Sequence, residues 1–120
     1  MVRIMIAEDS DSTRMFLRDV LETANYEVVE EAIDGNDAIK KFKLSKPDIL
    51  LLDNHMPKKD GLTTLMEIKT IDPHAKVIMI TISDEQKLIE DCINAGALAY
   101  ISKPFEMDTV LKAISYVLED

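Results

Sequence analysis

Residues 51–61 read LLDNHMPKKDG, and this stretch shows how the chain is built. The apolar run 49–52 ends abruptly at Asp53, and a turn rich in proline, lysine and glycine follows. A continuous apolar run of this length is typical of a strand covered on both faces. An acidic side chain at the tip of such a strand is costly to bury unless a cation or a reaction uses it. The stretch therefore predicts a buried parallel strand with a functional group at its carboxyl end.

Four further apolar runs alternate with segments of helical periodicity. Two are predicted as buried strands, and two weaker ones are predicted near an edge of the sheet. The alternation predicts one α/β domain, a doubly wound parallel sheet with helices on both faces. The predicted strands are 3–7, 27–31, 49–52, 77–82 and 99–102, and the predicted helices are 12–24, 36–44, 62–71, 85–95 and 107–118.

The apolar positions of the helices predict which side chains enter the core. Ser10 or Asp11 is expected to cap the first helix. Cys92 is expected to pack on the apolar side of the fourth helix, and most of the seven methionines are expected in the core. The residues of the first helix expected on one apolar face are Met15, Phe16, Val20 and Leu21.

Composition narrows the class of protein. A chain of 120 residues with 47% hydrophobic residues is long enough for one domain with one core. A single cysteine excludes an internal disulfide, and the apolar runs are too short to span a membrane. The N-terminus turns acidic too early for a secretory signal. The net charge of −9 disfavours direct binding of nucleic acid. A cytoplasmic protein without membrane insertion is expected.

Polar side chains stand at the carboxyl ends of four predicted strands. Glu8 and Asp9 follow the first strand, and Asp53 follows the third. In open parallel sheets, ligands bind beyond the carboxyl ends of the strands, where the strand order reverses. If the first strand neighbours the third there, the three carboxylates converge. The other residues at this edge are Thr81, Ser83, Ser102 and Lys103.

Converging carboxylates must take up protons or bind a cation. At about 5 Å and an effective dielectric constant of about 20, two carboxylates repel each other by roughly 3 kcal/mol. No histidine or cysteine cluster accompanies the acids, so a hard ion that prefers oxygen ligands is expected. Two or three carboxylates with room for water suit Mg²⁺ better than Ca²⁺. Glu8, Asp9 and Asp53 thus predict a Mg²⁺ site.

Four motifs in this order resemble those of a known family: Glu8-Asp9, Asp53 in LLDNHMPKKDG, Thr81 after VIMI, and Lys103-Pro104-Phe105. Together they are similar to the receiver domain of two-component response regulators, above all to stand-alone receivers of the chemotaxis CheY type. The resemblance covers residues 2–118. It implies one receiver domain over residues 1–120, strand order 2-1-3-4-5, and a cis peptide bond before Pro104.

The resemblance also implies roles for the residues of the acidic edge. Asp53 would accept a phosphoryl group from the phosphohistidine of a histidine kinase. Asp9, Asp53 and the main-chain carbonyl of His55 would hold Mg²⁺, which Glu8 would reach through water. Lys103 would pair with Asp53 at rest and with the phosphoryl oxygens afterwards.

A conformational switch is implied as well. The Thr81 hydroxyl would donate a hydrogen bond to the new phosphoryl group, and Tyr100 would fill the space that Thr81 vacates. The fourth helix, the fifth strand and the fifth helix would then report the change to a partner.

Three residues are expected to tune the rates of this chemistry. Ile82 stands where the family usually has a small residue, so it should crowd the path to Asp53 and slow both phosphorylation and loss of phosphate. His55, two residues after Asp53, lies at a position that varies in the family and tunes hydrolysis. Ser83 is placed to act similarly.

The resulting hypothesis is a monomeric signalling switch rather than an enzyme, although it would catalyse its own phosphotransfer and dephosphorylation. Its partners would be a histidine kinase and a downstream target, such as a flagellar motor component or a phosphatase. Alternatives within the family are a phosphorelay intermediate and the receiver part of a DNA-binding regulator. More distant alternatives are a small Mg²⁺-dependent phosphatase and a flavodoxin-like cofactor binder. The absence of a second aspartate shortly after Asp53 and of a glycine-rich phosphate loop disfavours these two.

Overall fold

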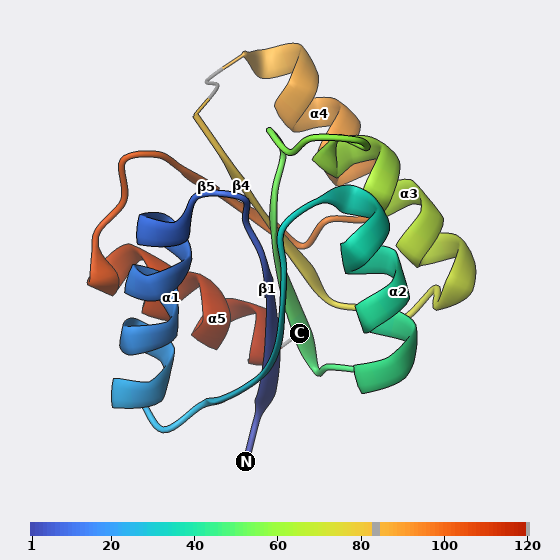
Figure 1. The fold of residues 1–120 in the computed structure, drawn as a ribbon. Helices are drawn as coiled ribbons and strands as arrows, with labels where there is room; N and C mark the ends of the chain where they lie inside the picture. Colours follow the sequence, from blue (N-terminus) through green and yellow to red (C-terminus); the bar gives the residue numbers. More distant parts are fainter. Residues whose placement is uncertain (83–84, 120) are drawn as a thin grey trace.

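Strands and helices alternate without exception along residues 1–82 and 85–119, the part of the chain that the computed structural model describes (Figure 1). The predicted order of elements is confirmed, and most boundaries move by one residue or not at all. The strands are β1 (Arg3–Ala7), β2 (Glu27–Ala32), β3 (Ile49–Asp53), β4 (Val77–Thr81) and β5 (Ala99–Ser102). The helices are α1 (Asp11–Thr23), α2 (Gly35–Ser45), α3 (Gly61–Ile71), α4 (Gln86–Asn94) and α5 (Met107–Glu119).

All five strands are parallel and lie in the order β2-β1-β3-β4-β5, which confirms the predicted sheet. The first strand neighbours the third, with Ala7 paired to Leu52, so their carboxyl ends lie side by side. The two weaker strands, β2 and β5, form the edges as expected. The chain order reverses between β1 and β3, and this is the edge at which a ligand is expected.

Helices cover both faces of the sheet (Figure 1). Ile4 and Ile6 of β1 belong to the core beneath α1 and α5, whereas Met5 and Ala7 belong to the core beneath α2, α3 and α4. Because successive residues of a strand point to opposite faces, the continuous apolar run of β1 supplies both cores. None of the described helices has the length and apolar character needed to cross a bilayer.

The prediction for the buried face of α1 is wrong in part. Met15 and Phe16 are 62% and 42% exposed, whereas Leu17, Val20 and Leu21 are buried. Positions 17, 20 and 21 form one stripe at helical spacing, and position 15 lies on the opposite side. Phe16 lies at the rim of the stripe, where its ring packs against that of Phe105 at a centroid distance of 6.0 Å.

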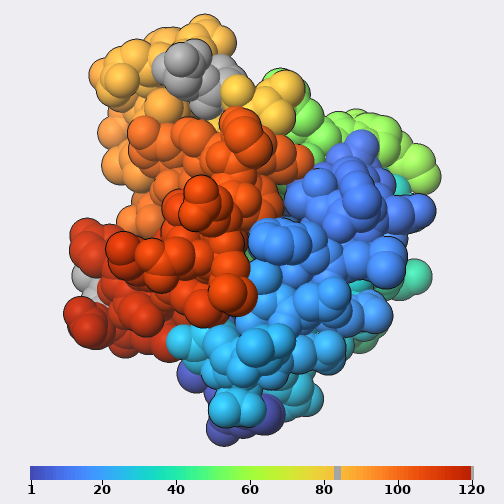
Figure 2. Space-filling model, turned by 90° about the vertical axis from the view of Figure 1, so that its left-hand side faces the viewer, coloured from blue at the N-terminus to red at the C-terminus, as the bar shows by residue number. Residues whose placement is uncertain are grey.

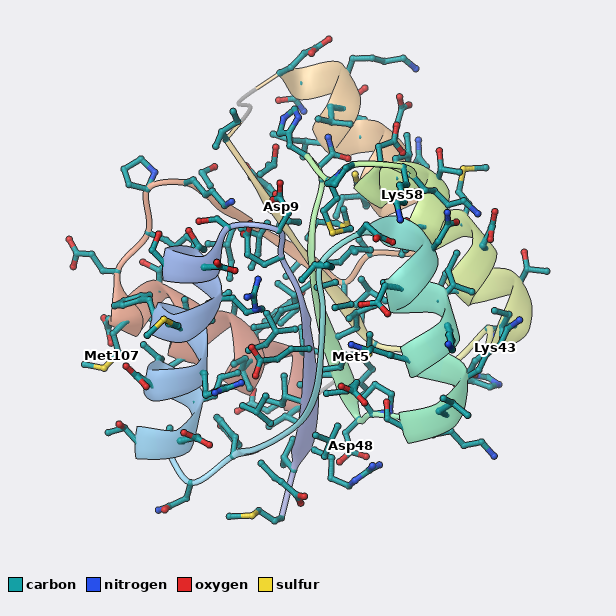
Figure 3. The ribbon with its side chains drawn as sticks, in the orientation of Figure 1. Met5, Asp9, Lys43, Asp48, Lys58 and Met107 are labelled. Carbon is teal, nitrogen blue, oxygen red and sulfur yellow. The ribbon has the colours of Figure 1, made fainter. Side chains whose placement is uncertain are left out.

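The prediction that most methionines are buried is also wrong. Met5, Met56 and Met79 are in the core, but Met1, Met15, Met66 and Met107 are exposed. Figure 3 shows the contrast between Met5, inside the fold beside the sheet, and Met107, which points outward. A flexible unbranched side chain is tolerated on either side of a helix, so its presence says little about burial.

Two local predictions hold. Ser10, rather than Asp11, caps α1, and its hydroxyl accepts a hydrogen bond from the Thr13 amide. Cys92 is buried on the apolar side of α4, and burial raises the pKa of its thiol.

Candidate functional site

Three carboxylates meet at the carboxyl end of the two central strands. Glu8 and Asp9 lie in the turn after β1, and Asp53 is the last residue of β3. One oxygen from each carboxylate lies within 4.8 Å of the others. Glu8 and Asp53 are buried, while Asp9 is exposed at the rim of the site (Figure 3). The neighbouring positions of β1 and β3 in the sheet bring these side chains together, as the sequence predicts.

Lys103 enters the same pocket from the segment that follows β5. Its ammonium nitrogen lies 2.7 Å from Glu8 Oε1 and 3.5 Å from Asp53 Oδ2. The peptide bond between Lys103 and Pro104 is cis, as the resemblance implies. The expected pairing with Asp53 is present, but Lys103 makes its shorter contact with Glu8.

Burial and charge shift the protonation equilibria of these groups. Burial raises the pKa of Glu8 to about 7, even though Lys103 and the Ser10 amide donate hydrogen bonds to its carboxylate. Burial also raises the pKa of Asp53, against the lowering effect of the Lys103 charge. Burial alone would lower the pKa of Lys103, but its hydrogen bond with Glu8 and the nearby Asp53 charge outweigh this and raise it. When all three carboxylates are ionised, the pocket holds more negative charge than the one lysine balances.

The donor set of the pocket fits Mg²⁺. Glu8, Asp9 and Asp53 supply only oxygen atoms, which is the set that this ion prefers, and a dication would offset the excess negative charge. The backbone amide of His55 donates to Asp53 Oδ1 at 3.3 Å, while its side chain is exposed. The coordination of Mg²⁺ by the carbonyl of His55 stays a prediction.

The predicted switch residues lie on β4, the strand next to Asp53, and on β5, which pairs with β4. Thr81, the last residue of β4, is 3% exposed, and β4 pairs with β3 at Asp53. Tyr100 lies on the edge strand β5 and is 42% exposed, which leaves its ring half outside the fold. Ser83 lies outside the described residues.

Ile82 borders a cleft beside the pocket. Its side chain is 65% exposed and, with Phe16 and Phe105, lines a cleft of about 450 Å³ that Lys103 also reaches. Figure 2 shows the face on which α1 and the segment after β5, which supply these rings, lie side by side. Ile82 therefore flanks the site on the side of the cleft, and its effect on rates stays a prediction.

The turn after Asp53 is fixed by contacts that sequence reasoning missed. Asn54 is 7% exposed, and its side-chain oxygen accepts a hydrogen bond from the Leu62 amide at 3.2 Å. Gly61 starts α3 so close to this turn that an added Cβ would lie 2.5 Å from the carbonyl oxygen of Asp53. Two features of the sequence could have indicated these contacts. One is an asparagine directly after the acid at the strand end, and the other is a glycine at the start of the next helix.

Three acids and a lysine thus meet where the chain order reverses between β1 and β3, and comparison with known families assigns the chain accordingly. Residues 4–115 match the model of the response regulator receiver domain. The chain belongs to the response regulator receiver family. Receiver domains are signalling modules and are generally not classed as enzymes.

The relatives of this receiver include both stand-alone and larger regulators. Chemotaxis protein CheY of Bacillus subtilis is 43% identical over 116 residues, 97% of each chain. The transcriptional regulatory protein PdtaR of Mycobacterium tuberculosis is 39% identical over 114 residues, which are 93% of this chain and 54% of that protein. The crystal structure of the CheX-CheY-BeF3-Mg+2 complex from Borrelia burgdorferi matches with a TM-score of 0.96 at 34% identity, covering 98% of this chain and 89% of that one.

Proposed function

We propose that this receiver is a phosphorylation-dependent switch in which Asp53 accepts a phosphoryl group from a histidine kinase. The observation that carries the proposal is the convergence of three carboxylates and one lysine at the end of β1 and β3. A buried acid cluster of this kind is unstable as an isolated set of charges, and it is explained by a reaction that uses both a cation and a carboxylate nucleophile.

The transfer is a substitution at phosphorus. An Asp53 carboxylate oxygen attacks the phosphoryl group of a phosphohistidine, the new P–O bond forms as the P–N bond breaks, and the imidazole leaves with the electron pair. Mg²⁺ bound by Asp9, Asp53 and the His55 carbonyl would neutralise charge on the phosphoryl oxygens. Lys103 turns from the resting carboxylates to a phosphoryl oxygen, and the Thr81 hydroxyl donates to another.

The response to phosphorylation follows from the same contacts. Thr81 moves toward the phosphoryl group, and the half-exposed Tyr100 turns into the space behind it. The phosphoryl group shifts a pre-existing equilibrium by its stronger interaction with one state. The partner is proposed to read the change on α4, β5 and α5. The bound phosphate is lost by hydrolysis in the same pocket, at a rate tuned by His55, Ile82 and Ser83.

We further propose that the receiver works in chemotaxis-type signalling, as a monomer in the cytoplasm. The full-length match to CheY of Bacillus subtilis supports this reading. The match to about half of PdtaR supports the alternative, in which the receiver serves a regulator of transcription. Capture experiments with and without beryllium fluoride distinguish the chemotaxis reading from a phosphorelay. They would recover a flagellar motor component in the first case and a histidine phosphotransfer protein in the relay.

Phosphorylation of the purified chain tests the proposed function. Incubation with a small acyl phosphate and Mg²⁺ should add the mass of one phosphoryl group to the intact protein, and Asp53→Asn should prevent it. Asp19→Asn, on the exposed side of α1, is the matched control and should react like the parent. A mass gain that survives Asp53→Asn would overturn the proposal, and catalytic release of phosphate from monoesters would favour a phosphatase.

A further inference from the structure

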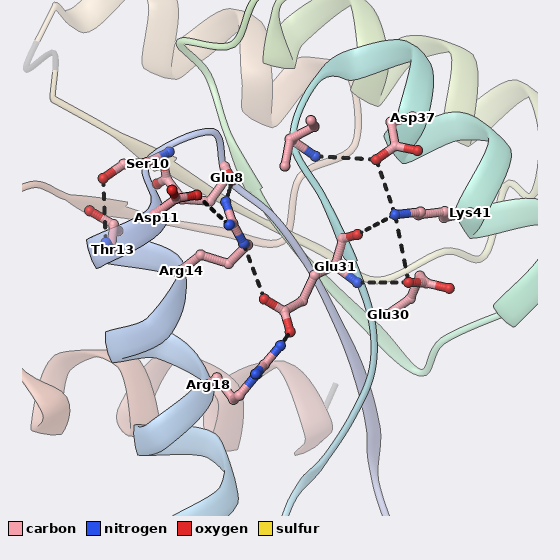
Figure 4. A network of polar contacts seen from close by, with 11 residues as sticks. Glu8, Ser10, Asp11, Thr13, Arg14, Arg18, Glu30, Glu31, Asp37 and Lys41 are labelled. Atoms are coloured by element: carbon pink, nitrogen blue, oxygen red, sulfur yellow. Dashed lines mark hydrogen bonds and ion pairs between the residues drawn. The ribbon is translucent and has the colours of Figure 1, made fainter.

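We propose that Arg14 is a positioning residue that holds the turn carrying Glu8 and Asp9 in the form that binds Mg²⁺. The inference rests on the proposed function, because it concerns the metal site of that reaction. Arg14 lies in α1, and its Nη1 donates a hydrogen bond of 2.9 Å to the main-chain carbonyl oxygen of Glu8 (Figure 4). Arg14 stands six residues after Glu8, and this spacing in the sequence does not by itself indicate a role in the site.

The carbonyl that Arg14 holds belongs to the peptide group between Glu8 and Asp9. Because the peptide group is planar, the orientation of this one plane restricts ψ of Glu8 and φ of Asp9 together. The amide of Glu8 donates to the Ala32 carbonyl of β2 at 2.9 Å, so the residue is fixed on its strand side. On the helix side, the amide of Ser10 donates to the Glu8 carboxylate at 3.1 Å. Arg14 adds a restraint on the carbonyl of the peptide between the two acids.

Two acids hold Arg14 in place from either side. Its Nε lies 3.2 Å from Glu31 Oε1 on the edge strand β2, and its Nη2 lies 2.5 Å from Asp11 Oδ1 at the start of α1. The Arg14 and Glu31 side chains are only 16% and 18% exposed, so this ion pair is partly shielded from water. Arg18, one turn further along α1, pairs with the other oxygen of Glu31 (Figure 4).

The three contacts use the planar fork of the guanidinium group. Three different nitrogen atoms of Arg14 face Glu8, Asp11 and Glu31 at once. A lysine has one nitrogen at the end of a flexible chain and does not reproduce this geometry. The two acids also keep the positive charge on the carbonyl side of the turn. The Arg14 charge therefore does not pair with the metal-binding carboxylates, and it does not compete with the ion for them.

The direct test is Mg²⁺ affinity measured by calorimetric titration of the folded protein. Arg14→Gln and Arg14→Lys should each weaken Mg²⁺ binding by about tenfold, as is common when a partner of a metal ligand is lost. Arg18→Gln is the matched control, since it removes another arginine of α1 that pairs with Glu31 but does not touch Glu8. Its dissociation constant for Mg²⁺ should stay within about twofold of the parent value.

Amide hydrogen exchange distinguishes positioning from a general loss of stability. In the metal-free Arg14→Gln protein, the amides of Asp9 and Ser10 should exchange faster, whereas the Leu51 amide of the central strand should not change. Faster exchange at Leu51 as well would mean that Arg14 supports the whole fold, and would overturn the inference. If the Arg14 variants do not fold, Glu31→Gln replaces them. It leaves the arginine in place and should still weaken Mg²⁺ binding more than Arg18→Gln does.

The outcomes separate this inference from the proposed function. Parent protein that binds Mg²⁺, with Arg14 variants that bind it equally well, would overturn the positioning role alone. Equal losses in Arg14→Gln and Arg18→Gln would do the same, because only one of these arginines touches Glu8. Parent protein that does not bind Mg²⁺ would overturn both.

Discussion

Glu8→Gln should remove the contribution of Glu8 to the dependence of stability on pH that the metal-free protein shows between pH 4.5 and about pH 7. The Glu8 side chain is fully buried, and burial raises its pKa from 4.5 to about 7. The folded protein therefore holds a proton at this site that the unfolded chain has already released. The resulting stabilisation is fully present below pH 4.5 and is lost as the pH rises through about 7.

The size of the effect follows from the shift. A rise of about 2.5 units, from 4.5 to about 7, corresponds to about 3 kcal/mol at 1.36 kcal/mol for each unit. In EDTA, the parent should lose free energy of unfolding of this order between about pH 5 and about pH 8. The raised pKa of Asp53 adds a loss in the same direction, and it remains in the variant. Glutamine keeps the shape of the protonated acid, so Glu8→Gln should show a much flatter profile.

Urea denaturation followed by circular dichroism at both pH values measures this difference. Glu22→Gln, on the exposed side of α1, is the matched control and should keep the pH profile of the parent. Mg²⁺ should reverse the trend, because the dication favours the ionised form of the carboxylates around it and stabilises the folded state more at high pH. Equal slopes for the parent and Glu8→Gln in EDTA would refute the reasoning.

Three substitutions test other parts of the site. Gly61→Ala should lower the free energy of unfolding by about 1–3 kcal/mol and slow phosphorylation, because its Cβ would lie 2.5 Å from the carbonyl oxygen of Asp53. Urea denaturation and labelling rates measure this, and a variant that matches the parent in both would contradict it. Ile82→Ala should speed both phosphorylation by small donors and loss of phosphate several-fold, and unchanged rates would remove Ile82 from rate control. His55→Asn should change the half-life of the phosphorylated protein, and an unchanged half-life would show that the imidazole takes no part.

Much of the fold and the outline of the site are predictable from this sequence. The continuous apolar run before Asp53 indicates a strand buried on both faces, and the polar residues at successive strand ends indicate where a ligand binds. The resemblance to receivers adds the strand order, which the structure confirms. The convergence of Glu8 and Asp53 then follows from the neighbouring positions of their strands.

The remaining features depend on directions that local sequence does not determine. Phe16 packs against Phe105 from the segment after β5, a contact that the periodicity of its own helix does not reveal. Lys103 lies closer to Glu8 than to Asp53 because of how two separate loops meet, and a long glutamate side chain reaches it. The hydrogen bond from Arg14 to the turn before its own helix depends likewise on the position of a distant acid on β2.

Asp53 should be the phosphoryl acceptor, and its reaction should need the ion bound by its acidic neighbours. Borohydride reduces an acyl phosphate on aspartate to homoserine, and tandem mass spectrometry of the digested protein then locates the modified residue. After reaction with a small acyl phosphate, homoserine should appear at position 53 in Mg²⁺ and be absent in EDTA. Homoserine at Asp9 instead, or equal conversion of Asp53 with and without Mg²⁺, would contradict the account.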